Sequence, residues 1–163
     1  MGRYGRFGPD SSMFRGAAKV TLDDKGRMVV PSRFRELLVD GPEGQVIVTI
    51  NLDSECLAIY PMSEWVPMEK KLMALSAVNP AVQQLQRLVV GHAVDLTLDG
   101  HSRMLIPPEL RDFAAIDRHA QLVGLGHKCE LWQEDRWVER RGGWLKTKIP
   151  REELPAELDS LPL

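Results

Sequence analysis

The chain has 163 residues, of which 44% are hydrophobic and 27% are charged, and its net charge is −2. These values are ordinary for a soluble globular protein, and no apolar run is long enough to span a bilayer. We therefore exclude a membrane protein. No charged-then-apolar signal peptide opens the chain.

The first sixth of the chain predicts an arm followed by a pair of strands. Met1–Ser12 is rich in Gly and Ser without an apolar period, which favours a disordered arm, an upstream start or a cloning remnant, with Met13 as the native start. Ala17–Leu22 alternates apolar and polar residues as a strand does. Asp23–Gly26 is typical of a turn, and Arg27–Val30 is a second short strand.

Helices and strands then alternate. Pro31 and Ser32 predict a helix to about Val39, because proline suits a first turn and serine suits an N-cap. After a glycine break the chain predicts two strands, a helix that restarts at Pro67, and an apolar-striped helix that begins at Asn79-Pro80. The two strands are Gln45–Asn51 and Leu57–Tyr60, and the first of these helices is Ser63–Ala74.

The most informative feature is a ten-residue motif that occurs twice. Leu22–Pro31 returns as Leu98–Pro107 with Asp, Arg, Met and Pro at the same relative positions, 76 residues later. Arg35 likewise matches Arg111. Each copy is small enough to depend on the other for a core, so we expect an intertwined pair of modules.

The second copy predicts the same order of elements. The strands are 93–98, 103–106, 121–125 and 129–133, and the helices are 108–115 and 134–140, with a stop at Gly142-Gly143. The tail beyond holds three prolines and scattered charge, so disorder and a packed arm are equally open. We divide the chain into 1–12, a first repeat 13–87, a second repeat 88–145 and a tail 146–163.

Charge is unevenly distributed. Met13–Arg35 contains six basic and two acidic residues, hence +4, which leaves the rest of the chain acidic. Such a segment is either a solvated face or a surface for a polyanion. Cys56 and Cys129 occupy equivalent places in the two copies, which favours reduced core thiols over a disulfide, and their spacing offers too few ligands for zinc. We expect no metal and no cofactor.

Several runs together resemble the MraZ family over about Met13–Trp144. They are Phe14-Arg15-Gly16-Ala17, Leu22-Asp23-x-Lys25-Gly26-Arg27, Val30-Pro31-x-Arg33-Phe34-Arg35, Gln86-Arg87-Leu88, Gly91-His92-Ala93 and Asp99-x-x-x-Arg103-x-Leu105-Ile106-Pro107-Pro108-Glu109-Leu110-Arg111. Two Asp-x-x-x-Arg motifs in register are specific, whereas one alone is weak.

The resemblance implies an α+β fold in which the two repeats form a swapped-hairpin, AbrB-like β-barrel with flanking helices. It also implies a homo-oligomeric ring of eight or more subunits. Proteins of this family repress the bacterial division and cell-wall gene cluster by binding repeated promoter boxes in double-stranded DNA. They are cytoplasmic and nucleoid-associated. Gly100-His101-Ser102 departs from the first turn, since it lacks the lysine.

The candidate DNA-binding residues are basic. For Arg27 we favour DNA contact, with Asp23 holding the side chain in place, and for Arg103 we favour an ion pair to Asp99 that orders the turn. The other expected contacts, mainly to phosphates, are Arg15, Lys19, Lys25 and Arg33. Arg33 and Arg35 are two apart on a helix and cannot face the same way.

Two other classes of function stay open. One is an assembly or adaptor protein that uses the barrel only for oligomerisation. The other is an enzyme that uses the region of His92, Asp95, Asp99 and His101, although these groups do not converge as a catalytic site requires and no phosphate loop or nucleophile elbow is present. The four tryptophans favour core or interface anchors over base stacking.

Overall fold

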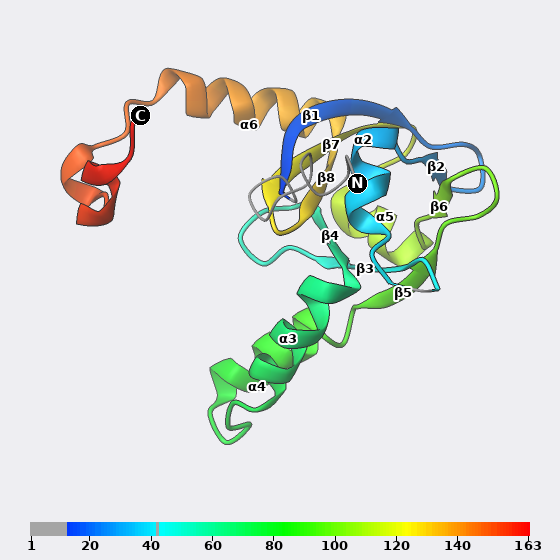
Figure 1. Cartoon of the computed structure of the whole chain (residues 1–163), viewed down its shortest axis with the longest axis horizontal. Helices are drawn as coiled ribbons and strands as arrows, with labels where there is room; N and C mark the ends of the chain where they lie inside the picture. Colours follow the sequence, from blue (N-terminus) through cyan, green and yellow to red (C-terminus); the bar gives the residue numbers. More distant parts are fainter. Residues whose placement is uncertain (1–12, 42) are drawn as a thin grey trace, which may run out of the picture.

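A computed structural model describes residues 13–41 and 43–163; the arm expected at 1–12 lies outside the described residues. The fold is α+β, with a six-stranded antiparallel sheet, a two-stranded ribbon and flanking helices (Figure 1). The strands are β1 Phe14–Thr21, β2 Arg27–Val29, β3 Gln45–Ile50, β4 Leu57–Pro61, β5 Val94–Thr97, β6 Arg103–Leu105, β7 His119–Gly126 and β8 Cys129–Gln133. The helices are α2 Ser32–Leu38, α3 Met62–Met73, α4 Pro80–Val89, α5 Pro108–Ala114 and α6 Glu134–Lys146, followed by the 3-10 turns η2 Arg151–Glu153 and η3 Ala156–Ser160.

The two repeats exchange strands, which confirms the intertwined pair. The sheet order is β1-β7-β8-β4-β3-β5, so the first strand of each repeat pairs with the third strand of the other. The two last strands, β4 and β8, pair at the centre, and the two second strands form the separate β2–β6 ribbon. Every sheet contact between the repeats therefore has a counterpart related by an approximate two-fold exchange.

The barrel that the resemblance implied is not confirmed, because the sheet is open. Strands β1 and β5 are its two edges, and each leads into a turn that passes the chain to the ribbon. The ribbon packs on one face of the sheet through Met28 and Met104, which are paired with each other and are 0% exposed. Burial of these two methionines therefore holds the ribbon over the sheet without closing it.

The main hydrophobic core lies between the sheet, the ribbon and the two short helices α2 and α5. It contains Phe34 and Leu38 from α2 and Leu110 and Ala114 from α5. Neither helix has a side-chain N-cap; Ser32 lies inside α2 rather than capping it, so that prediction is wrong. Their stability comes from the buried face rather than from capping.

The opposite face of the sheet carries α6 and a cluster of aromatic residues. Trp132 is 1% exposed. The ring centres of Trp132, Trp137 and Trp144 lie within 6 Å of one another, so the three side chains pack together. The expected helix stop at Gly142-Gly143 is wrong, since α6 continues to Lys146. Packing of Trp144 beyond the two glycines explains why they do not end the helix.

Helices α3 and α4 form a hairpin that projects from the β3 side of the sheet (Figure 1). Trp65 of α3 is buried, and the Gln86 amide of α4 donates to the backbone carbonyls of Leu72 and Leu75 at 3.1 and 3.2 Å. Pro67 lies inside an uninterrupted α3, so the predicted restart is wrong. The tail after α6 forms the turns η2 and η3.

Candidate nucleic-acid interface

The two Asp-x-x-x-Arg motifs form the same turn at the entrance to each strand of the ribbon. Asp23 Oδ1 accepts hydrogen bonds from the backbone amides of Lys25 and Arg27 at 3.0 and 2.9 Å, and its Oδ2 accepts one from Arg27 Nε at 2.7 Å. This carboxylate therefore closes the turn and orients the arginine at once.

The second turn repeats these contacts atom for atom. Asp99 Oδ1 accepts from the amides of His101 and Arg103 at 2.8 and 2.9 Å, and Oδ2 accepts from Arg103 Nε at 2.8 Å. Backbone bonds match as well, since Asp99 N donates to Arg103 O just as Asp23 N donates to Arg27 O. The two arginines therefore have equivalent local environments.

The turn geometry requires a left-handed residue just before each arginine. Gly26 has φ +86°, and Ser102 at the equivalent position has φ +61°. Glycine adopts this conformation without steric cost, whereas serine does not. The first turn therefore has the less strained backbone.

Hydrogen bonding keeps both aspartates ionised. Amide donation from Arg27, with further donation from the Arg27 side chain and the Lys25 amide, lowers the pKa of Asp23 from 3.8 to about 2. The amide of Arg103 is the first cause of the lowered pKa of Asp99. Each turn therefore holds a carboxylate–guanidinium pair at neutral pH.

The register of the ribbon brings the two arginines to one face. Arg27 pairs with Leu105, and Val29 pairs with Arg103, while the paired Met28 and Met104 face the core. Side chains alternate along a strand, so the residues next to the two methionines lie on the outer face of the ribbon. They are Arg27, Val29, Arg103 and Leu105. Arg27 and Arg103 are diagonal neighbours, a separation of about 7–8 Å.

The anchoring of each arginine leaves its terminal nitrogens available. Nε is the atom that each guanidinium uses toward its aspartate. Within the described part of the chain, no hydrogen bond is recorded for the Nη atoms of Arg27 or Arg103. The outer face of the ribbon thus presents two oriented pairs of donors, flanked by the aliphatic Val29 and Leu105, which are 54% and 49% exposed.

Lys25 extends this surface, whereas Arg15 and Lys19 do not. Lys25 is exposed at the tip of the first turn. Lys19 pairs with Gln121 of β7 and lies 3.9 Å from Glu134 at the start of α6, so it is on the sheet face opposite the ribbon. Arg15 lies six residues, about 20 Å, from the end of β1 that leads into the turn.

Arg33 occupies a third place. Its guanidinium lies 4.8 Å from the centre of the Phe34 ring, and it lines a hollow with Arg15 at the start of β1. The sequence suggested one basic surface from Arg15 to Arg33, but the structure divides these residues among the ribbon, the α6 face and α2. These residues are close in sequence but not in space, because the extended strand β1 separates Arg15 from the turn that carries Lys25 and Arg27.

Arg35 and Arg111 have a structural role that the sequence analysis did not predict: each holds a helix to the preceding strand. Arg35 Nη2 donates to Val30 O at 3.0 Å, and Arg111 Nε donates to Ile106 O at 2.9 Å. Each therefore fastens its helix to the strand that precedes it. Their match at the repeat offset was the signal that could have shown this.

His92 and Asp99, two residues of the enzyme hypothesis, each have a local hydrogen-bond partner. His92 Nδ1 contacts Leu88 O at 2.9 Å at the end of α4, and Asp99 is engaged in its own turn. No cluster of three or more His, Cys, Asp or Glu residues able to hold a metal ion occurs in 13–41 and 43–163. Cys56 and Cys129 are buried free thiols, and burial raises the pKa of each to about 12.

Comparison with known sequences decides the family. The profile described as "MraZ protein, putative antitoxin-like" matches residues 13–88 and 89–140, one segment for each repeat. The chain belongs to the MraZ family. The MraZ relatives include the transcriptional regulator MraZ of Thioalkalivibrio sulfidiphilus, which is 48% identical over 151 residues covering 93% of this chain and 100% of the relative.

Other MraZ relatives are similarly close. The transcriptional regulator MraZ of Halorhodospira halophila is 44% identical, with 93% of this chain and 100% of the relative covered. That of Pseudomonas fluorescens is 50% identical over 125 residues, or 77% and 83% of the two chains. No described helix has both the length and the apolar character needed to cross a bilayer.

Proposed function

We propose that this chain is a non-catalytic, sequence-specific transcriptional repressor whose β2–β6 ribbon binds double-stranded DNA. The observation that carries the proposal is the outer face of the ribbon, where Arg27 and Arg103 are both oriented by an aspartate and both keep their terminal nitrogens available. The relatives' shared name, transcriptional regulator, supports the same class of function.

The dimensions and chemistry of the ribbon suit the major groove. A major groove about 12 Å wide admits a two-stranded ribbon, and a bidentate arginine–guanine pair contributes about 1–3 kcal/mol of discrimination. Because Asp23 and Asp99 restrain Nε, the two Nη atoms of each arginine form a preorganised donor pair. The exposed Val29 and Leu105 complete the face with aliphatic groups of the kind that contact thymine methyls.

One ribbon offers few cationic contacts on a chain whose net charge is −2. Lys25 and the two arginines of a single subunit should therefore bind weakly and with strong salt dependence. We propose that assembly into a homo-oligomeric ring tethers several ribbons, so that repeated promoter boxes are bound together. Tethering can raise avidity by a factor of about 10²–10⁴.

The regulated genes would be those of the division and cell-wall cluster, and the bound promoter would be the one upstream of the chain's own gene. This function places the protein in the cytoplasm, in association with the nucleoid. The two repeats, 13–87 and 88–145, would then act as one binding unit, because each contributes one strand to the ribbon.

Footprinting on the DNA upstream of the chain's own gene tests the proposal. We expect protection of several short, regularly spaced repeats, and an affinity that falls steeply as salt rises. A probe with a single box should bind more weakly than one with three or four. Absence of a footprint, or binding that does not respond to salt, would instead favour an adaptor that uses this fold only for assembly.

A further inference from the structure

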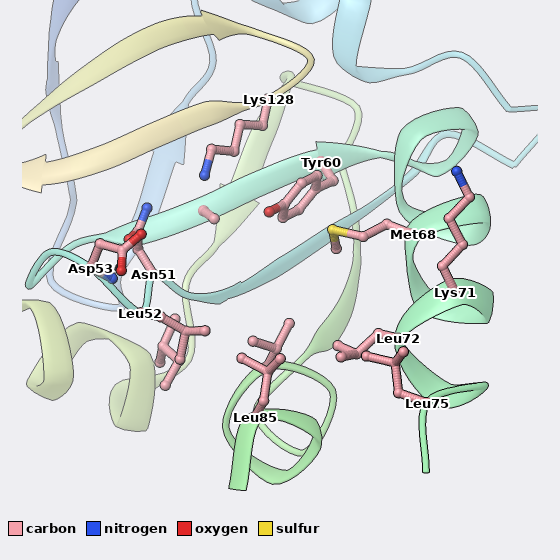
Figure 2. Close-up of a pocket in the computed structure, with 13 residues that line it drawn as sticks. Asn51, Leu52, Asp53, Tyr60, Met68, Lys71, Leu72, Leu75, Leu85 and Lys128 are labelled. Carbon is pink, nitrogen blue, oxygen red and sulfur yellow. Dashed lines mark hydrogen bonds between the residues drawn. The ribbon is translucent and has the colours of Figure 1, made fainter. Parts of the chain in front are cut away.

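An apolar groove lies between the sheet and the α3–α4 hairpin, remote from the ribbon. Its volume is about 410 Å³, and Figure 2 shows its walls. One wall is Ala58 and Tyr60 of β4, and the other is formed by apolar side chains of the two helices and of the loop between them. Those side chains are Met68, Leu72, Leu75, Leu85 and Val89.

The groove is a partly exposed apolar surface on the hairpin. Leu75 is 49% exposed and Leu52 at the far end is 45% exposed, while Leu72 and Leu85 are only half-buried. Lys71 and Lys128 lie at its margin, and Asp53 is also part of the lining. Such a surface, apolar with a polar rim, is typical of an interaction site.

The tail of the same chain has the complementary character. Residues 147–163 are exposed throughout except for the half-buried Leu158, and they include Ile149, Leu154, Leu161 and Leu163 at 66%, 40%, 50% and 91% exposure. Four acidic residues are interspersed with these apolar ones, against two basic residues. The acidic residues are Glu152, Glu153, Glu157 and Asp159.

Prolines also restrict the backbone conformation of the tail before it binds. Pro150 and Pro155 precede the turns η2 and η3, and Pro162 follows the second turn. Proline fixes its own φ and so reduces the conformational entropy that a segment loses when it binds. A leucine-bearing segment with little freedom to lose is therefore exposed to solvent in the isolated subunit.

We propose that the tail of one subunit docks into the α3–α4 groove of a second copy, with its leucines in the groove and its carboxylates facing Lys71 and Lys128. Helix α6 leads the tail away from α3 and α4 over 13 residues, about 20 Å (Figure 1), so another subunit's groove is the natural receptor. The inference rests on the proposed assembly and names the surfaces that hold it together.

Photocross-linking of the full chain tests the docking directly. A photoreactive benzoylphenylalanine replaces Leu158, and equal amounts of ¹⁵N-labelled and unlabelled protein are mixed without DNA. We expect cross-links from position 158 to the groove, within 50–53, 68–75 or residue 128, and among them peptides that join a labelled to an unlabelled chain. Cross-links confined to one chain, or directed to another surface, would overturn the proposal.

Charge reversal supplies a second test. Lys71→Glu with Lys128→Glu should raise the concentration at which the oligomer dissociates by roughly tenfold or more, as measured by sedimentation. Adding Glu157→Lys and Asp159→Lys should restore assembly, and Lys70→Glu, beside the groove but outside its lining, is the control. Unchanged assembly in the first variant, or no recovery in the combined one, would contradict the inference.

The two proposals fail separately. Inter-subunit cross-links without a promoter footprint would leave the docking intact and remove the DNA function. A salt-sensitive footprint without groove cross-links would leave the DNA function intact and remove the docking.

Discussion

The Arg111 side chain lies directly against Gly26, so that the second repeat supports the turn of the first. A β-carbon built on Gly26 would be 2.6 Å from Arg111 Nε, and Gly26 also has φ +86°. Arg111 Nε meanwhile donates to Ile106 O, which fixes the guanidinium in place. The turn that carries Lys25 and Arg27 thus depends on a residue of the other repeat.

We expect Gly26→Ala to destabilise the protein by more than about 1 kcal/mol, because alanine meets both the positive φ and Arg111. The measurement is the free energy of unfolding in denaturant. Gly100→Ala is the control in the second turn, where no described residue other than its chain neighbours lies within 4 Å of the added carbon and φ is not positive. Equal stability losses in the two variants would contradict the account of the turn.

The two faces of the ribbon should respond differently to truncation. Met28→Ala removes a side chain that is 0% exposed and should cost about 2–5 kcal/mol. Val29→Ala, on the outer face, should change stability by about 0.5 kcal/mol or less. Thermal melts of the two variants check this, and a large loss in Val29→Ala would mean that the outer face is covered.

The lowered pKa of Asp23 predicts how stability depends on pH. Because the folded-state pKa is about 2 and the usual value is 3.8, the carboxylate contributes its full stabilisation above about pH 3.8 and loses it as pH falls toward 2. Asp23→Asn should reduce this part of the acid dependence. Carboxyl ¹³C titration of the wild type checks the value directly, and a midpoint near 3.8 would show that the turn hydrogen bonds are not maintained.

Arg27→Ala should abolish specific DNA binding while the oligomer stays intact. Since Arg27 and Arg103 have matching bonds to Asp23 and Asp99, Arg103→Ala should loosen its own turn to a similar degree. We expect its loss of affinity to be the smaller one, because His101 replaces Lys25 at the tip of its turn. Gel shifts and melts run side by side separate the two effects; normal binding by Arg27→Ala would refute the assignment.

Lys25→Ala should weaken binding to all sequences alike and reduce the slope of log affinity against log salt by about one, if this side chain neutralises one phosphate. Anisotropy titrations at several salt concentrations measure the slope. Lys19→Ala is the comparison, since Lys19 lies on the α6 face near Glu134. We expect it to leave the slope unchanged, and a similar change in both variants would show that DNA also contacts the sheet.

The sequence predicted the local elements well because their signals are local. The alternation in β1, the aspartate turns and the proline-started helices all appear near their predicted places. The continuation of α6 past Gly142 and Gly143 could not be predicted, because it depends on Trp144 packing with Trp132 and Trp137. That contact joins residues 12 apart across a helix and a strand, which no pattern of nearby residues contains.

The candidate site was predicted in its chemistry but not in its geometry. The repeated motif identified Asp23, Arg27, Asp99 and Arg103, yet only the β2–β6 register shows that both arginines share one face. The structure places Arg15 and Lys19 away from these four residues, since strand direction and sheet pairing determine where a side chain points. The repeated motif also carried no signal for the tail–groove contact that we propose.

The exchange of strands between the repeats has a consequence for biosynthesis. Strand β1 is made first, but its partner β7 extends to Gly126, so β1 has no hydrogen-bonding partner until most of the chain has left the ribosome. Strand β3 similarly waits for β5, although β4 can pair with it at once. Such long-range pairing makes folding slow and leaves strand edges exposed to other nascent chains. Neighbouring ribosomes on one messenger therefore hold half-made chains whose first repeat can find its missing strand in another molecule.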